Sequence, residues 1–368
     1  MSNDSMRPDD LGAPARAGAP PDLSILLISY RRPDDLYATL GDVAAQHAAA
    51  RVEVVCVLQA YPAGEADRLT QAFAAARGGA DPGARGPTEL RIVEHAEGLG
   101  VHGARNEALR HARGRVVAFL DDDVRLAPDW VATLLPYFDA PNLGGVGGYV
   151  WHPGCDAPGV RVLRPLLGMA SRRYRVDWGG YHTMPYSGHP DEDQPADWLS
   201  GCNMAFRRAA LDALAVEGGI ESAPAGDGPF VATYGNYGYD DVDVCVRLRA
   251  AGWRLVSTQR LAVRHYPSAT NRPVVADLVR AEEERRVAFV RRAIGDRAFW
   301  RARYVARTAL NLVAATVYGI RKREPGLAWD VAAGAWAGLR RHGRDARRAG
   351  AARTVGAAAL RAARSHAA

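Results

Sequence analysis

The chain has 368 residues, of which 48% are hydrophobic and 24% are charged. These proportions are ordinary for a globular protein and exclude a fully disordered or collagen-like chain. The length allows two domains, or one large domain with an appendage.

The net charge of +6 is an average over two unlike parts of the chain. From Val275 to the C-terminus there are 20 basic and 8 acidic residues, whereas residues 1–274 hold 27 basic and 33 acidic residues. An acidic body therefore carries a basic C-terminal segment.

No targeting segment or membrane-spanning helix is predicted. Residues 1–22 are rich in Pro, Ala, Gly and Asp and lack the apolar stretch of a signal peptide, which predicts a disordered leader. No apolar run reaches the ~18 residues of a transmembrane helix. The four cysteines form no C-x-x-C pair, which argues against a disulfide scaffold or a thiolate zinc site and fits a cytoplasmic location.

Apolar runs and helical patterns alternate along the first part of the chain. Helices are expected from Pro33 onward and over residues 65–77 and 101–112. Before, between and after them lie four expected strands, at residues 23–29, 52–58, 89–94 and 115–120. This alternation predicts an α/β fold, with a mostly parallel sheet flanked by helices. In such sheets, ligands bind beyond the carboxyl ends of the strands.

The rest of the chain is less regular. Helices are expected at residues 128–138 and 240–251, and a helical pattern runs from Pro273 to the end. Four more strands are expected, at residues 144–150, 197–206, 253–257 and 261–265. We therefore expect three segments, namely the leader 1–22, an α/β domain 23–272 and a basic helical tail 273–368.

Three consecutive aspartates, Asp121, Asp122 and Asp123, follow the fourth expected strand. Their mutual repulsion costs stability unless a cation lies among them, and hard divalent cations prefer oxygen ligands. Residues i and i+2 of an extended segment share a face, so Asp121 and Asp123 could point at one ligand with Asp122 turned away. Taken alone, the cluster fits a metal site and a solvated acidic turn equally well.

A second acidic group, Asp240, Asp241 and Asp243, opens the helix expected at residues 240–251. Acidic side chains complement a helix N-terminus, which is a sufficient structural explanation for them. His265 ends the last expected strand, and a lone histidine is usually a surface or core residue. The aspartates at 121–123, the acids that open this helix and His265, however, all stand at the ends of elements, where a sheet of this kind binds its ligands. Together they indicate a site.

A glycine motif offers an alternative function. Gly98, Gly100 and Gly103 match G-x-G-x-x-G between an expected strand and helix, with aspartates about 20 residues further on, as in a dinucleotide site. An NAD(P)- or FAD-dependent oxidoreductase is therefore a competing interpretation. The motif stands on the third strand–helix unit, whereas the fingerprint belongs on the first, and it gives no role to Asp241 or His265.

Five segments in order resemble the motifs of a family 2 glycosyltransferase with the GT-A fold. The opening ISYRRPDDL resembles the family's P-T-Y-N-R start, and GLGVHGARNEAL its G-x-x-x-A-R-N-x-G segment. AFLDDDV resembles the metal-binding D-x-D. WLSGCNMAFRRAAL and GYDDVDVCVRLRAAGW resemble the later strand and the E-D-containing helix of the family. The resemblance runs from about Leu23 to His265.

This resemblance implies an inverting, metal-dependent transfer of a sugar from a UDP-, dTDP- or GDP-linked donor to an acceptor hydroxyl. It implies Asp121, Asp123 and His265 as ligands of Mn²⁺ or Mg²⁺, and Asp241, beside Asp240, as the general base. Residues 23–123 would form the nucleotide-sugar half and 124–272 the acceptor half, with the acceptor near 151–196. Contacts to the nucleotide and sugars are expected from these residues: Tyr30, Arg32, Gln59, Arg105, Asp121, Trp198, Ser200 and Gly201.

The sequence departs from the family pattern at the end of the second expected strand. The usual acidic V-D-D-x-S is replaced by Val57-Leu58-Gln59-Ala60, so Gln59 would have to contact the base. The triple aspartate and the later histidine also resemble bacterial galactofuranosyl- and rhamnosyltransferases. That likeness implies a glycan, lipid-linked or small-molecule acceptor and a role in cell-envelope polysaccharide.

The basic tail has three possible roles. It could pack on the acidic body or on a partner chain. It could lie on an anionic membrane, as a peripheral contact on the inner face of the plasma membrane, with Trp300, Tyr304, Leu310, Val313 and Val317 in the lipid. The third role, binding to nucleic acid, is not expected, because no nucleic-acid-binding fold is recognised.

Overall fold

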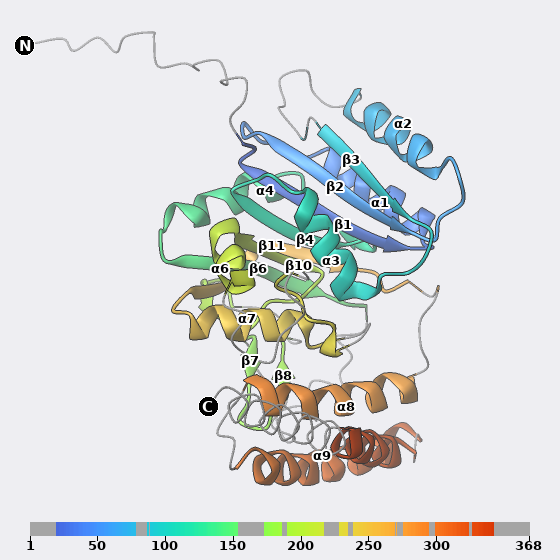
Figure 1. Cartoon of the computed structure of the whole chain (residues 1–368), viewed down its shortest axis with the longest axis vertical. Helices are drawn as coiled ribbons and strands as arrows, with labels where there is room; N and C mark the ends of the chain where they lie inside the picture. Colours follow the sequence, from blue (N-terminus) through green and yellow to red (C-terminus); the bar gives the residue numbers. More distant parts are fainter. Residues whose placement is uncertain are drawn as a thin grey trace, which may run out of the picture.

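In the computed structural model, residues 20–78, 87, 89–153, 173–185, 190–216, 228–234, 238–268, 270, 275–293, 299–323 and 326–341 are described. Their strands form a nine-stranded sheet in the order β3-β2-β1-β4-β10-β6-β11-β5, with β9 paired to β11 (Figure 1). Hydrophobic clusters lie on both faces of this sheet. The predicted α/β fold with flanking helices is confirmed.

The first half of the sheet is parallel. β1 (Leu23–Tyr30) lies between β2 (Val52–Gln59) and β4 (Val116–Asp121), and β2 also pairs with β3 (Glu89–His95). Alternate residues of β1 face opposite sides, so Ile25 and Leu27 pack in the cluster that holds α1, and Leu26 packs with α3. The connecting helices are α1 (Pro33–Ala44), α2 (Glu65–Gly78) and α3 (Gly100–His111).

The second half of the sheet is mixed. β10 (Asn203–Arg207) runs antiparallel to both β4 and β6 (Leu143–Trp151), and β11 (Arg254–His265) runs parallel to β6. The end of β11 pairs with the two-residue strand β5 (Val124–Arg125), which follows the three aspartates. β9 (Gln194–Pro195) pairs with β11, and β7 (Arg175–Val176) pairs with β8 (His182–Thr183).

Four expected elements differ from the structure. The strand predicted at 197–206 is wrong in its first part, because residues 197–202 form a loop before β10, and α6 (Arg208–Val216) follows β10 directly. The helix predicted at 128–138 divides into α4 (Trp130–Leu134) and a 3₁₀ helix, η2 (Leu135–Asp139), where Pro136 removes a backbone donor. The strands predicted at 253–257 and 261–265 are one strand, β11, with a register shift between Thr258 and Val263.

The C-terminal helices pack on the α/β body. α8 (Val275–Ala293) contacts α7 (Asp240–Ala250), η3 (Ala232–Tyr234) and α9 (Trp300–Lys322). Figure 1 shows α8 and α9 beyond α7, at the opposite end of the molecule from α2. Ion pairs join Arg292 to Asp243 at 3.2 Å and Arg307 to Asp177 at 2.6 Å. The basic tail therefore pairs with the acidic body, as one of the three expected roles requires.

A buried arginine joins α8, α9 and the body. Arg286 donates to the carbonyl of Gly179 at 2.7 Å, to the Thr308 hydroxyl at 2.5 Å and to Glu283 at 2.8 Å. Its guanidinium also lies 4.0 Å from the ring centre of Tyr181. One side chain thus satisfies groups from three segments at once.

Parts of the expected leader and acceptor region lie outside the described residues. Of residues 1–22, the structure describes 20–22, where Asp22 N–H donates to the carbonyl of Arg51 at 2.9 Å. Of residues 151–196, positions 154–172 and 186–189 are outside the described part. Among the residues that are described, no helix combines the length and apolar content that a bilayer span requires.

Candidate active site

The acidic cluster lies where β4 ends, at the carboxyl edge of the parallel strands. Asp121 is the last residue of β4, and Asp123 immediately precedes β5. Asp122 points away from these two, toward β1, where the hydroxyl of Ser29 donates to its Oδ2. Arg32 lies 3.3 Å from Asp122 and 3.6 Å from Asp123. The alternation expected for an extended segment thus separates Asp122 from the other two aspartates.

Asp122 holds the loop in place. Its carbonyl oxygen accepts a hydrogen bond from Thr39 of α1 at 2.7 Å, and only 4% of its side chain is exposed. Burial raises the pKa of Asp122 to about 7, against the opposing effects of Ser29 and Arg32. These contacts of Asp122 are all with residues of the chain itself, which favours a role in positioning the loop over a role in ligand binding.

Asp123 and His265 meet because β5 pairs with the end of β11. The register places His265 opposite Val124, and Tyr266 N–H donates to the Asp123 carbonyl at 2.9 Å. His265 Nε2 then lies 2.8 Å from Asp123 Oδ1. Asp121, Asp123 and His265 each offer a ligand atom, and these atoms all lie within 4.8 Å of one another.

The two carboxylates of this trio have opposite pKa shifts. Burial raises the pKa of Asp121, with Arg105 opposing the rise and Asp123 adding to it. Burial also acts to raise the pKa of Asp123, but the hydrogen bond and charge of His265 hold that pKa below its usual range. Two carboxylates with one imidazole form a donor set that fits a hard divalent cation better than a soft one.

His152 is a site residue that the sequence interpretation missed. It follows β6, the neighbour of β11, and its Nδ1 lies 3.1 Å from His265 Nδ1. The two rings meet edge to face at 4.8 Å. His265 thereby turns Nε2 toward Asp123 and Nδ1 toward His152. The position of His152 directly after an expected strand was the available signal.

Arg105 of α3 connects the trio with the start of α7. Its Nη1 lies 2.5 Å from Asp240 Oδ2, and its Nη2 lies 3.8 Å from Asp121 Oδ1. Burial acts to lower the pKa of Arg105, but the charges of Asp240, Asp121 and Asp241 raise it overall, so the guanidinium stays charged. Asp240 is buried in this ion pair, which positions Arg105.

Asp241 presents its carboxylate at the N-terminus of α7. Its Oδ2 accepts a hydrogen bond from Gly201 N–H at 2.9 Å. Tyr239, the residue before the helix, has a left-handed φ of +69°, a conformation that costs a non-glycine residue free energy. Burial and the charge of Asp240 raise the pKa of Asp241, against the opposing charges of Arg105 and His182. A carboxylate with a raised pKa suits a general base.

Asp243, the third acid of this helix, has a structural role. It accepts a hydrogen bond from the Tyr234 hydroxyl at 2.9 Å and pairs with Arg247 at 2.7 Å and with Arg292 of α8. Of the three acids, Asp241 is the one that faces the loop at Gly201.

Tyr30 and Gln59 lie at the ends of β1 and β2, as expected. Tyr30 is 39% exposed and its ring packs over Gly98, where a Cβ atom would come within 3.2 Å of it. Gln59 is buried, and its Oε1 accepts from Leu99 N–H at 2.8 Å. Gln59 therefore fixes the loop before α3, and the first glycine of the G-x-G-x-x-G motif packs against a tyrosine.

The loop of residues 198–201 is divided between the core and the site. Trp198 is 4% exposed, donates to the Thr183 carbonyl at 3.0 Å and packs its ring against His182 at 4.7 Å. Ser200 is half-buried and lies 3.3 Å from the Cys202 sulfur. Trp198 thus supports the loop from behind, whereas Ser200 and Gly201 lie beside Asp241.

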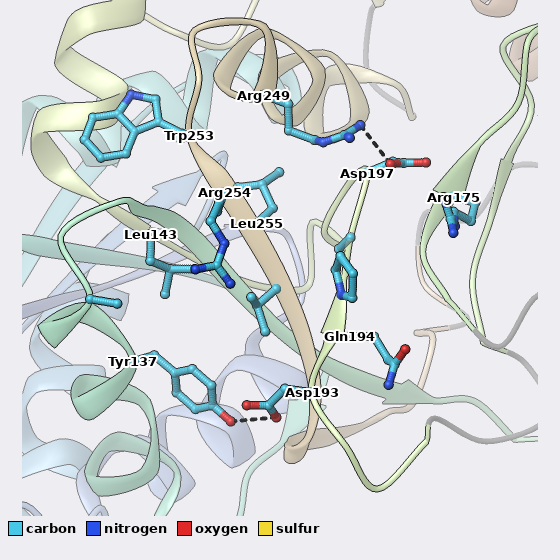
Figure 2. A pocket seen from close by; sticks show the side chains of 14 residues that line it. Tyr137, Leu143, Arg175, Asp193, Gln194, Asp197, Arg249, Trp253, Arg254 and Leu255 are labelled. Carbon is cyan, nitrogen blue, oxygen red and sulfur yellow. Dashed lines mark hydrogen bonds and ion pairs between the residues drawn. The ribbon is translucent and has the colours of Figure 1, made fainter.

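A hollow of about 520 Å³ lies elsewhere on the molecule, between η2, β9 and the start of β11. Figure 2 shows the Arg249–Asp197 ion pair and the Tyr137–Asp193 hydrogen bond on its walls. Arg249 is nine residues along α7 from Asp240, a rise of about 14 Å. The hollow is therefore separate from the acidic cluster, although Arg175 and residues 193–196 on its wall belong to the region where the acceptor is expected.

Comparison with known proteins agrees with this geometry. The family described as "Glycosyl transferase family 2" matches residues 24–214. The uncharacterized protein y4gI of Sinorhizobium fredii is 24% identical over 204 residues, which is 55% of this chain and 21% of that protein. The O-antigen biosynthesis protein RfbC of Myxococcus xanthus is 27% identical over 171 residues, 45% of this chain and 12% of that protein. The chain thus spans a small part of both relatives.

Two solved structures share the fold. The mannosyltransferase PcManGT from Pyrobaculum calidifontis, in complex with GDP-Man and Mn²⁺, has a TM-score of 0.51 and 18% identity, over 88% of each chain. GalNAc-T7 with UDP, GalNAc and Mn²⁺ has a TM-score of 0.50 and 14% identity, over 84% of this chain and 59% of that one.

Proposed function

Because the chain belongs to glycosyl transferase family 2, we propose that it transfers a sugar from a nucleotide-diphosphate sugar to an acceptor hydroxyl with inversion at the anomeric carbon. The acceptor oxygen forms a bond to the anomeric carbon as the bond from that carbon to the diphosphate oxygen breaks. The GDP-mannose and UDP bound in the two similar structures support a nucleotide-linked donor.

We propose that Asp121, Asp123 and His265 hold a Mn²⁺ or Mg²⁺ ion. Their ligand atoms lie close enough together to contact one cation, and the Mn²⁺ of the two similar structures supports this choice. A bound divalent cation neutralises the charge that develops on a leaving diphosphate. Arg32 and Arg105 add fixed positive charge on two sides of the trio.

Asp241 is the proposed general base. It lies at the positive end of α7, where Gly201 N–H orients its carboxylate. The proton of the acceptor hydroxyl would pass to this carboxylate as the new bond forms. Asp240, beside it, keeps Arg105 in place through an ion pair of 2.5 Å.

One observation supports this proposal most strongly. Arg105 lies 3.8 Å from Asp121 of the trio and 2.5 Å from Asp240, and the charge of Asp241 also acts on it, so one guanidinium links the proposed metal site to the proposed base. Tyr30, Gln59 and Ser200 lie at strand and loop ends around it, where we propose contacts with the nucleotide and sugars.

Ligand-dependent thermal shifts test the donor class. UDP-, dTDP- and GDP-sugars with Mn²⁺ should raise Tm, whereas NADH and FAD should leave it unchanged. Release of nucleoside diphosphate in the presence of candidate acceptors then tests transfer. Stabilisation by NADH alone would instead favour the oxidoreductase alternative built on Gly98, Gly100 and Gly103.

The acceptor and location are proposed from the resemblance. We propose a glycan, lipid-linked or small-molecule acceptor with a role in cell-envelope polysaccharide, bound by the half of the domain after Asp123, and a cytoplasmic location. The three cysteines within the described residues, Cys56, Cys202 and Cys245, are buried and free, which supports a reducing compartment.

A further inference from the structure

The solvent-facing side of α9 is apolar along most of the helix. Its exposed large side chains recur every three to five residues, and the exposed Ala306 and Ala309 fill the longest gap. From Ala302 to Ile320 this face extends about 27 Å. We call it the α9 stripe, and its large members are 43–71% exposed: Val305, Leu310, Val313, Val317 and Ile320.

The opposite side of α9 already has its structural partner. Tyr304 and Thr308 are buried there, and Tyr304 packs with Val287 and Val290 of α8. The expectation that Tyr304 would enter a membrane is therefore wrong, because its ring belongs to the core. A helix that packs by one face normally presents polar residues on the other. A second apolar face of this length indicates an interaction surface.

The helical residues 327–341 add two exposed indoles. Trp329 and Trp336 are 70% and 63% exposed, and their spacing of seven residues places them on one side of the helix. The other side packs closely on α8, since a Cβ atom at Gly334 would lie 2.4 Å from the carbonyl of Arg280. Tryptophan is favoured where an apolar layer meets water.

The charge of the C-terminal segment indicates what kind of surface the α9 stripe binds. From Val275 onward there are 20 basic and 8 acidic residues, and exposed Arg303 and Arg340 stand on the helices that carry the apolar groups. A second copy of the chain would bring two such basic segments together, which is unfavourable. An anionic bilayer accepts both the apolar side chains and the arginines. We infer that the α9 stripe, with Trp329 and Trp336, docks on an anionic lipid surface.

This surface is independent of the sugar transferred, so it can be tested separately from the proposed reaction. The full chain is mixed with vesicles of phosphatidylcholine, or of phosphatidylcholine with 30% phosphatidylglycerol, and bound protein is measured by flotation. Binding should be strong on the anionic vesicles, weak on the neutral ones, and reduced by added salt. The double variant Val313→Gln/Ile320→Gln should bind anionic vesicles at least tenfold more weakly.

Ala74→Gln/Ala75→Gln is the matched control, because it adds the same two amides to the exposed side of α2 at the other end of the molecule. The control should float like the wild type, and both variants should keep the wild-type Tm. The inference is wrong if the wild type does not bind anionic vesicles, or if Val313→Gln/Ile320→Gln binds them as well as the control does. It is equally wrong if light scattering shows a dimer that this variant dissociates, since the stripe would then be a contact between copies.

Discussion

Arg105 occupies the space that a side chain at position 201 would need. A Cβ atom on Gly201 would lie 2.3 Å from Arg105 Nη2. The absence of a side chain at Gly201 therefore makes room for the Arg105 guanidinium. Gly201 also donates its N–H to Asp241, so this loop positions both Arg105 and Asp241.

Gly201→Ala should therefore displace Arg105 and lower activity. We expect kcat/KM to fall by roughly 10- to 100-fold, the loss of about 1.4–2.7 kcal/mol of transition-state stabilisation. Steady-state kinetics measures the change. Gly41→Ala, in α1 with open space around its Cβ position, is the matched control and should retain full activity. Equal activity of the two variants would show that Arg105 has no part in transfer.

Asp241→Asn should abolish most of the transfer while keeping donor binding. Removal of a general base costs about 10²- to 10⁴-fold in rate. The raised pKa of Asp241 places the acidic limb of the wild-type pH–rate profile above the usual range of an aspartate, because the carboxylate must be ionised to act. Donor affinity from calorimetry should stay within about twofold. A variant that turns over normally would exclude Asp241 as the base.

The same substitution should stabilise the protein at neutral pH. The folded state holds a proton on Asp241 more tightly than the unfolded chain does, so folding stability is lost as pH rises through the raised pKa. Asparagine removes this loss. Tm of Asp241→Asn should exceed that of the wild type at pH 7.5, and the difference should vanish below about pH 4, where the unfolded aspartate is also protonated. An unchanged Tm at pH 7.5 would contradict the prediction.

His152 should act through His265. Replacing His265 by alanine should remove most Mn²⁺ affinity, measured by calorimetry in the presence of UDP, whereas His152→Ala should weaken it by about 10- to 100-fold, as loss of a ligand's supporting partner does. His152→Gln, which keeps a polar group near His265 Nδ1, should recover part of this loss. Wild-type Mn²⁺ affinity in His152→Ala would show that His265 needs no such support.

Arg286→Ala should destabilise the whole molecule. The substitution leaves the Glu283 carboxylate buried without its partner cation and removes the hydrogen bond from α8 to Thr308 of α9. Such losses lower the free energy of unfolding by about 3–5 kcal/mol. Urea unfolding measures the change. The double variant Arg286→Met/Glu283→Met removes both charges and should recover part of the stability. Arg303→Ala, exposed on α9, should be nearly neutral.

The parallel half of the fold and the position of Asp121, Asp123 and His265 at the ends of strands were predictable because each depends on a local pattern. Buried strands read as apolar runs, and Asp121, Asp123 and His265 stand at their ends. What the sequence could not give is pairing between distant segments. β5 has two residues, too few for any period, yet its ladder with β11 is what joins His265 to Asp123.

Roles that depend on three-dimensional neighbours were also beyond the sequence. Nothing in the chain around Gly201 predicts that Arg105, about a hundred residues earlier, fills the space beside it. Trp198 and Gln59 were expected at the ligand, and the sequence does not show that their polar atoms also bond backbone groups within the protein. Tyr304 and Leu310 belong to one amphipathic pattern, and the packing of α8 decides which of them is buried.

The ion pair between Asp243 and Arg292 connects the C-terminal helices to α7, the helix that carries the proposed base. Asp243 lies two residues after Asp241 on α7, and Arg292 holds it from α8. The helix that presents the proposed base is thus braced by the same helical layer whose outer side carries the α9 stripe. A chain cut after the sheet would lose the helical layer that packs on α7, so the proposed lipid-binding surface and the proposed base depend on the same packing.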